Sequence, residues 1–441
     1  MSSIETPNRW AGRPGSGGEI AYLTKPLTWI FLVTGFALSP LGDFLSVYAL
    51  KGSVGGDFGA RYSLFIRGIV IVGLLVAMTF RGKVHSSNLR IAFLVALAIA
   101  ASTCSYTLGG MTRDEFVEEI IVILKVFSFF VYVAALCGLS DRQLSKLEPL
   151  IRAVLIIYAL SIVAGAIFSI EMFRSYRGET HIRAGYKGIV YAQNETSALM
   201  MAGLAYGCLR VLRNGWNTAD GLFVGILLTA SFLVGTKGAM VGALGVIFAY
   251  SYARYGVLKA TLRAATLVML LIGVAFAVYL SVPSVQQAAD LSINYFAYHH
   301  DRANEDQLLT ILMSGRNLKF ANVWNDLAQQ NFVALLTGGY PTVRYPIEID
   351  GPDLMLALGF PVFCLYLYDL GRQFIHRSSS PVVRFGKLFF FVLIIIAFTA
   401  GHVLTSAIVA PFLAVIAVVV KRSALSNNSA LLMLGQNDGA N

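Results

Sequence analysis

Long apolar stretches separated by short polar segments are the feature that most constrains how this chain can fold. Each stretch is roughly 17 to 24 residues long, enough for a helix to cross the hydrocarbon core of a bilayer. Lipid offers no hydrogen bonds to the backbone, so such stretches are expected to be helical. They lie near residues 27–50, 64–80, 90–109, 116–138, 150–172, 193–212, 221–236, 238–253, 261–282, 352–370, 385–400 and 403–420. The sequence therefore predicts an all-α polytopic membrane protein with about twelve transmembrane helices.

Composition agrees with a membrane protein. The chain is 56% hydrophobic and 13% charged, with a mean hydropathy of +0.68, whereas a soluble protein carries about 25% charged residues. The four cysteines lie in or beside apolar stretches and lack the spacing of a zinc site or a disulfide framework. The polar first 25 residues lack the apolar core of a cleaved signal peptide. The seventh and eighth stretches are so close that the sequence leaves three alternatives: a very tight turn, a re-entrant pair, or a wrongly placed division between the two.

Basic residues predict the orientation. With the N-terminus in the cytoplasm, every cytoplasmic segment holds at least two basic residues, and together these segments hold 20 of the 34 Lys and Arg residues. This positive-inside bias places both termini in the cytoplasm and the chain in a bacterial inner membrane. The net charge of +10 is thereby explained without nucleic acid. The expected parts are a polar tail (1–26), spans one to nine (27–282), a long outer segment (283–351), spans ten to twelve (352–420) and a second tail (421–441).

One short outer segment opposes this bias. Residues 173–192 contain Arg174, Arg177, Arg183 and Lys187. Ordinary solvation with neighbouring glutamates would account for them, but so would an anion-binding site that faces the outer compartment.

The long outer segment is expected to be folded. Phe320, Val323, Trp324 and Leu327 recur at the spacing of an amphipathic helix, and leucines between 308 and 312 suggest another. Such helices would lie on the outer membrane surface as a lid.

Several charged residues are candidates for chemistry at the outer side. Lys237 lies between two apolar stretches, where an ammonium is costly unless it meets an anion. That anion is either a distant acid or headgroup, or a phosphate-bearing ligand. Arg316 and Arg344 add further cations. Asp350 and Asp353 begin the tenth stretch, where they fit a helix start but also a base for a sugar hydroxyl.

Charges inside the apolar stretches are the remaining suspects. Arg67, Glu118, Glu119 and Lys125 are functional candidates by position, although a Lys–Glu pair that holds two helices together is an equal interpretation. The six histidines show no metal-ligand spacing, so no metal site is assigned. There is no P-loop, Rossmann glycine motif, HExxH or CxxC, and no cofactor is expected.

Short motifs in order along residues 180–370 resemble those of bacterial O-antigen polymerases and ligases. They are Ile182–Gly185 with Gln193–Asn194, Thr236–Ala239, Ser314–Arg316, Leu336–Tyr340, and Asp350–Asp353 leading into Leu356–Pro361. The chain departs from the family in having Lys237 where an arginine is typical, and in lacking the ligase His-Asn element. The second departure favours a polymerase.

The resemblance implies a GT-C-like, Wzy-type polymerase of a surface polysaccharide, such as O-antigen or exopolysaccharide. Glycan on undecaprenyl diphosphate would be transferred onto a lipid-linked repeat unit at the periplasmic face. Arg183, Lys237 and Arg316 would bind the diphosphate and stabilise the departing charge. Asp350 or Asp353 would deprotonate the acceptor. Asn194, Arg174, Arg177 and Arg344 would contact the substrate.

Two alternatives remain open on the sequence. One is the ligase of the same superfamily, and the other is a secondary transporter or lipid-linked sugar flippase, although no internal repeat supports a transporter. A chain-length regulator protein is a possible partner by resemblance alone.

Overall fold

Helices form almost all of the regular structure. The computed structural model describes the backbone of residues 17–49, 61–80, 86–175, 185–281, 286, 290, 313–329 and 331–437. Within these ranges there is no β-strand, and an isolated antiparallel bridge joins Arg174 and Tyr186. The predicted all-α class is confirmed for this part of the chain.

Five helices in the first part of the chain are long and apolar enough to cross a bilayer. They are α1 (Gly17–Ala49), α2 (Tyr62–Thr79), α3 (Ser86–Thr107), α4 (Arg113–Cys137) and α5 (Asp141–Ile167). Thr112 and Ser140 start α4 and α5 with capping boxes, in which side chain and backbone satisfy each other's hydrogen bonds. The length and apolar composition of the five helices identify a membrane protein.

The second group of helices is built around a buried centre. It comprises α6 (Gln193–Asn214), α7 (Thr218–Leu233), α8 (Lys237–Tyr255) and α9 (Val257–Ser281). α6 is buried from Thr196 to Leu209, between α7, α8 and α17 (Ala410–Asn437). α7 and α8 are separated by only three residues, of which Gly235 has a φ of +73°. The very tight turn expected between these two stretches is the arrangement found.

The C-terminal part departs from the prediction in two places. Its other helices are α12 (Arg316–Gln329), α13 (Val333–Thr337), α14 (Asp350–Leu358), α15 (Phe360–Phe374) and α16 (Pro381–Ala397). The stretch predicted as one span over 352–370 is divided at Gly359, where φ is +80°. α14 is too short to cross a bilayer, at about 1.5 Å per residue. The last predicted span, 403–420, becomes helical only at Ala410.

The predicted tails are partly helical. α1 begins at Gly17 and α17 continues to Asn437, inside the segments 1–26 and 421–441 that were expected to be polar tails. Residues 1–16 and 438–441 and the helical stretch expected near 308–312 lie outside the described residues.

The amphipathic helix expected in the long outer segment is confirmed as α12. Its Val323 and Leu327 are buried against Tyr340, Ile347 and Leu356 in a small hydrophobic cluster separate from the main core. The segment 338–349 and α14 therefore form the base on which α12 packs.

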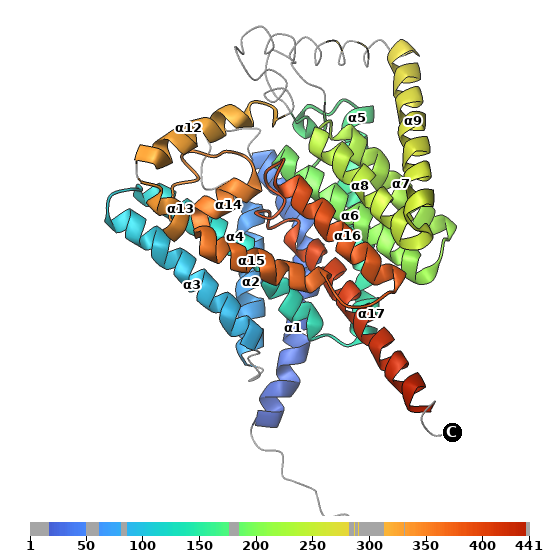
Figure 1. Ribbon diagram of the computed structural model, residues 1–441, viewed down its shortest axis with the longest axis horizontal. Helices are drawn as coiled ribbons and strands as arrows, with labels where there is room; N and C mark the ends of the chain where they lie inside the picture. The colour runs from blue at the N-terminus through green and yellow to red at the C-terminus, as the bar shows by residue number, and fades with distance from the viewer. Residues whose placement is uncertain are drawn as a thin grey trace, which may run out of the picture.

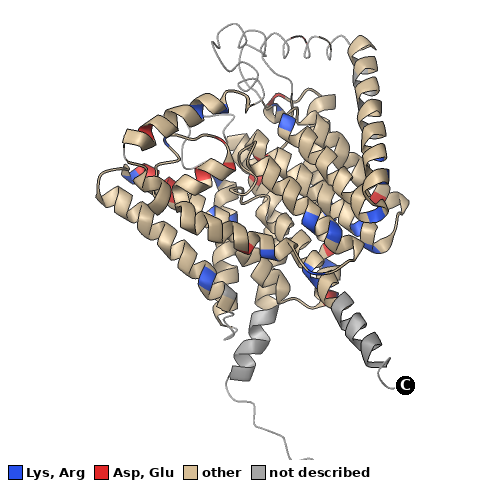
Figure 2. Ribbon diagram, viewed as in Figure 1, with Lys and Arg blue, Asp and Glu red and all other residues tan. Residues whose placement is uncertain are grey.

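The molecule has two distinct ends along its helices. α1 begins and α17 ends on one side, here called the terminal face, and α12 lies on the opposite side, here called the α12 face (Figure 1). Basic residues near the terminal face are visible in Figure 2, and several are paired: Glu148 binds Arg210 at 2.5 Å and Arg213 at 2.9 Å. Asp220 lies 3.2 Å from Arg210.

Candidate functional site

The connection between α16 and α17 is organised by one buried carboxylate. Asp350 is 2% exposed. Its Oδ1 accepts the backbone N–H of His402 at 2.6 Å and the hydroxyl of Thr405 at 3.0 Å. Its Oδ2 accepts the backbone N–H groups of Val403 and Leu404, both at 2.6 Å. A carboxylate has about four acceptor positions, so all of them are used.

This arrangement corrects the expectation that Asp350 could act as a base. Burial raises the pKa of Asp350 above its ordinary value, and the charge of His402 and the backbone hydrogen bonds oppose that rise. Because its oxygens are filled from within the chain, Asp350 holds a loop in place and offers no acceptor to a ligand. The same contacts explain why α17 starts late, since the N–H groups of 402–404 are turned towards the carboxylate.

Asp353 has a similar but less complete role. Its two oxygens accept the backbone N–H groups of Ile347 and Glu348, both at 3.0 Å, and its side chain is half-buried. About two acceptor positions remain. Asp353 thus fixes the turn that precedes α14 and keeps some capacity to accept a proton.

The two residues with left-handed backbone at this site each donate a backbone N–H to one of these aspartates. Glu348 has a φ of +64° and His402 a φ of +65°, both unusual for residues other than glycine. The neighbouring Gly401 is so close to the carbonyl of Glu348 that an added Cβ would lie 2.7 Å from its oxygen. His402 is exposed. Strained backbone of this kind often occurs at functional sites.

Arg316 places a cation beside Glu348 and the loop that follows α16. It is the first residue of α12, its side chain is 16% exposed, and its guanidinium donates to the carbonyl of Thr399 at 3.3 Å. Its Nε lies 3.8 Å from the carboxylate of Glu348, which also receives Lys319 at 2.6 Å. Two cations therefore share one acid here.

The start of α8, where Lys237 lies, comes close to the same loop. It is the first residue of α8, whose N-cap Thr236 accepts the N–H of Ala239 at 3.1 Å and shares a 2.7 Å hydrogen bond with Ser197. An added Cβ on Gly238 would lie 3.5 Å from the Cβ of Ala400. The start of α8 and Arg316 therefore flank the residue pair 399–400, at a helix N-terminus that favours anions.

The start of α6 lies beside the start of α8. Gln193 donates to the carbonyl of Val234 at 2.9 Å, and the N–H of Tyr186 donates to Leu233 at 2.9 Å. Asn194 is in the first turn of α6. Arg174 pairs with Tyr186 in the β-bridge and lies 3.8 Å from Glu171. Arg177 and Arg183 fall outside the described residues.

Arg344 is engaged elsewhere. It binds both carboxylate oxygens of Glu115 in α4, and this contact raises the pKa of the guanidinium. One turn along α4, Glu119 is fully buried and accepts the hydroxyl of Thr342 at 3.0 and 2.9 Å. These bonds attach the turn 342–344 to α4, so Arg344 anchors the α12 side of the protein. Its predicted contact with substrate has no support in this geometry.

A buried ion pair was missed from the sequence. Arg67 in α2 binds Asp43 of α1 at 2.6 Å and Ser39 at 2.7 Å, and the hydroxyl of Tyr158 also donates to Asp43. Arg67 was recognised as an intramembrane charge. Its partner was overlooked because Asp43 is a lone acid inside the first apolar stretch. Such a cluster joins α1, α2 and α5.

No cluster of three or more His, Cys, Asp or Glu residues suited to a metal ion occurs among the described residues. No protein-family model matches the chain, and neither curated proteins nor solved structures show a significant similarity to it.

Proposed function

We propose that this protein is a membrane glycosyltransferase that polymerises lipid-linked oligosaccharides. The observation that carries the proposal is that Arg316 donates to the carbonyl of Thr399, while α8, which begins at Lys237, approaches the adjacent Ala400 through Gly238. In this proposal the α12 face is periplasmic, about twelve helices cross the inner membrane, and the fold is GT-C-like.

The cations have a defined task in this reaction. The leaving group is a polyprenyl diphosphate, whose negative charge grows as the glycosidic bond to it breaks. Positive groups fixed in advance near that charge lower the barrier. Arg316 is held in place by the carbonyl of Thr399 and the carboxylate of Glu348. Lys237 is the first residue of α8, and the N–H groups of this helix N-terminus also favour an anion.

The proton of the acceptor hydroxyl also needs a destination. The carboxylate oxygens of Asp350 already accept four hydrogen bonds from within the chain. His402, by contrast, is exposed on the loop that Asp350 holds in place. We assign His402 as the general base and Asp350 as a positioning residue. Asp353 orders the adjoining turn and is the second candidate for the base.

Purified protein supplied with lipid-linked repeat units should lengthen them in the presence of a chelator. K237A and R316A should slow elongation by about 100-fold, in the range typical for the loss of one charge-stabilising group. K259A is a matched control, because Lys259 is an exposed lysine near the start of α9. Wild-type rates for both variants would refute the assignment of these cations.

A deletion strain separates polymerase from ligase. Loss of a polymerase leaves single repeat units attached to the cell-surface acceptor, whereas loss of a ligase leaves no attached glycan. Accumulation of unattached long polymer in the deletion strain would favour the ligase and reject the proposal.

A further inference from the structure

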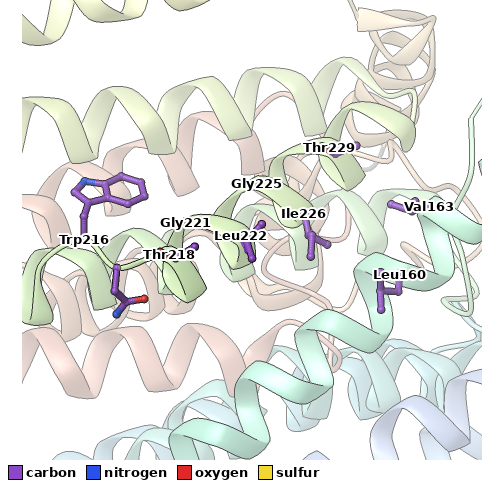
Figure 3. Close-up of a pocket in the computed structure, with 10 residues that line it drawn as sticks. Leu160, Val163, Trp216, Thr218, Gly221, Leu222, Gly225, Ile226 and Thr229 are labelled. Carbon is purple, nitrogen blue, oxygen red and sulfur yellow. The ribbon is translucent and has the colours of Figure 1, made fainter.

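A groove of about 760 Å³ runs along the side of the bundle between α5 and α7. Figure 3 shows Trp216 at one end of the groove and Leu160, Val163 and Thr229 at the other. Its walls are mainly aliphatic side chains and glycine. It is separate from the cation cluster around Arg316.

Two glycines of α7 keep the groove open. An added Cβ on Gly225 would meet nothing within 4 Å, and one on Gly221 would meet only the Trp216 ring, at 3.7 Å or more. Helix packing therefore does not require glycine at either position. By contrast, an added Cβ on Gly207 of α6 would lie 2.9 Å from Val224. Glycine destabilises a helix interior. The open space that it leaves at positions 221 and 225 is therefore the benefit that offsets this cost.

The two ends of the groove differ in character. Trp216 is 53% exposed and donates to the hydroxyl of Tyr250 at 2.7 Å, as expected for a tryptophan at a membrane–water boundary. At the other end, Val163 precedes Gly165, where an added Cβ would lie 2.9 Å from Phe173 and 3.1 Å from Tyr186.

That second end leads to basic residues. Thr229 lies one turn before Leu233, whose carbonyl accepts the N–H of Tyr186. Tyr186 is bridged to Arg174 and followed by Lys187, which is 9% exposed and whose ammonium donates to the carbonyl of Tyr191 at 2.5 Å. The only ion pair that Arg174 forms among the described residues is with Glu171, which is 64% exposed and 3.8 Å away. The groove walls are thus mainly apolar, and Arg174 is the cation that lies beyond the end near Val163.

We propose that this groove binds the isoprenoid chain of a polyprenyl-linked anion, with the phosphate end beside Arg174. A long apolar chain with a negative end would lie along the apolar wall and place its charge beside the cation at the end of the groove. A helix of a partner protein would fill the groove without using this charge complementarity. The identity of the ligand rests on the proposed function, since a polymerase must hold such a lipid from the periplasmic leaflet.

The test is direct lipid binding by the full-length protein in detergent, with undecaprenyl phosphate as the probe and native mass spectrometry as the readout. Gly225→Leu fills the groove and should weaken binding about tenfold or more. Gly68→Leu is the matched control, because Gly68 is an exposed helical glycine of α2 with nothing within 4 Å of an added Cβ. It should bind like the wild type. Equal binding by all three proteins would overturn the proposal.

Two further arms complete the test. Phosphatidic acid should compete poorly, and equally strong, equally Gly225-sensitive binding of it would identify the groove as a phospholipid site instead. A photoreactive polyprenyl phosphate should label the wild-type peptide 216–229 of α7 or the facing residues 160–163 of α5, and labelling confined to other helices would refute the inference without any variant. Binding is measured without elongation. A groove that binds the probe in an inactive protein would therefore reject only the proposed polymerase, and an active polymerase with an insensitive groove would reject only this inference.

Discussion

The carboxylate of Asp350 accepts the backbone N–H of His402 at 2.6 Å, which joins the start of α14 to the loop that follows α16. Three successive N–H groups and one hydroxyl converge on this side chain. Two segments far apart in sequence are thereby held as one surface at the α12 face.

Asp350→Ala is expected to destabilise the protein strongly. It would leave the buried N–H groups of Val403 and Leu404 without partners, at a cost of about 1–3 kcal/mol for each unsatisfied group. Thermal unfolding in detergent measures the effect. Asp141→Asn is the control, because Asp141 is 94% exposed and its loss should change stability by less than about 0.5 kcal/mol. Similar melting temperatures for the two variants would contradict the role of Asp350.

His402→Asn should separate chemistry from folding. Asparagine tolerates the left-handed backbone that His402 adopts, and Asp350 binds the backbone N–H rather than the imidazole. We expect normal stability and lipid binding, with elongation slowed by about 10²–10⁴-fold through loss of the base. An elongation rate within a few fold of the wild type would shift the assignment to Asp353.

Arg316→Lys tests whether shape as well as charge is needed. A lysine keeps the charge but cannot present two parallel N–H groups to a phosphate. Elongation should fall by about tenfold, less than for Arg316→Ala. Lys237→Arg is the reciprocal change and should be tolerated. If Arg316→Lys is as inactive as Arg316→Ala, the guanidinium is needed to hold Thr399 rather than a diphosphate.

The attachment of the turn 342–344 to α4 can be measured with a double-mutant cycle. Arg344→Ala and Glu115→Ala each remove the same two-oxygen ion pair. We expect a coupling energy of about 1 kcal/mol, at the upper end for a partly exposed pair. Hydrogen exchange over residues 340–345 should rise equally in both single variants. Additive effects, or unchanged exchange, would show that the pair does not hold the turn.

The buried pair of Arg67 and Asp43 should respond differently to single and double changes. Asp43→Leu leaves Arg67 without its charged partner inside the bundle, which should cost about 3–5 kcal/mol. Replacing both residues together, as Asp43→Leu with Arg67→Met, should recover most of that loss. Unfolding in detergent distinguishes the cases, and a double variant less stable than the single one would argue that the cluster has a function beyond packing.

Much of the helical organisation follows from hydrophobicity because a bilayer permits few alternatives. Each of the twelve predicted stretches overlaps a helix, although the tenth is divided at Gly359 and the last is helical only from Ala410. The tight α7–α8 turn is one of the arrangements that the spacing predicts. Gly359 was not recognised as a break, since the apolar run continues through it and the closely packed Gly338 is far away in sequence.

The candidate site was only partly predictable. Lys237 is a candidate because a charge between two apolar stretches is conspicuous, and Arg316 is a candidate through the motif Ser314–Arg316 of the resemblance. The sequence could not show that Asp350 is filled by the backbone of residues 402–404, because that contact depends on how two distant loops meet. The sequence alone indicates no more for His402 than an isolated histidine in an outer turn, because its left-handed backbone is a property of the fold.

The close approach of Gly338 to Gly359 bears on which residues of this protein can be substituted. A Cβ on either residue would lie 2.6–2.8 Å from main-chain atoms of the other segment, so the α12 segment is fastened to the bundle through its main chain. Such a joint does not depend on the side chains that surround it. The exposed residues of α12 can therefore change, and with them the shape of this surface, while the anchor underneath stays the same.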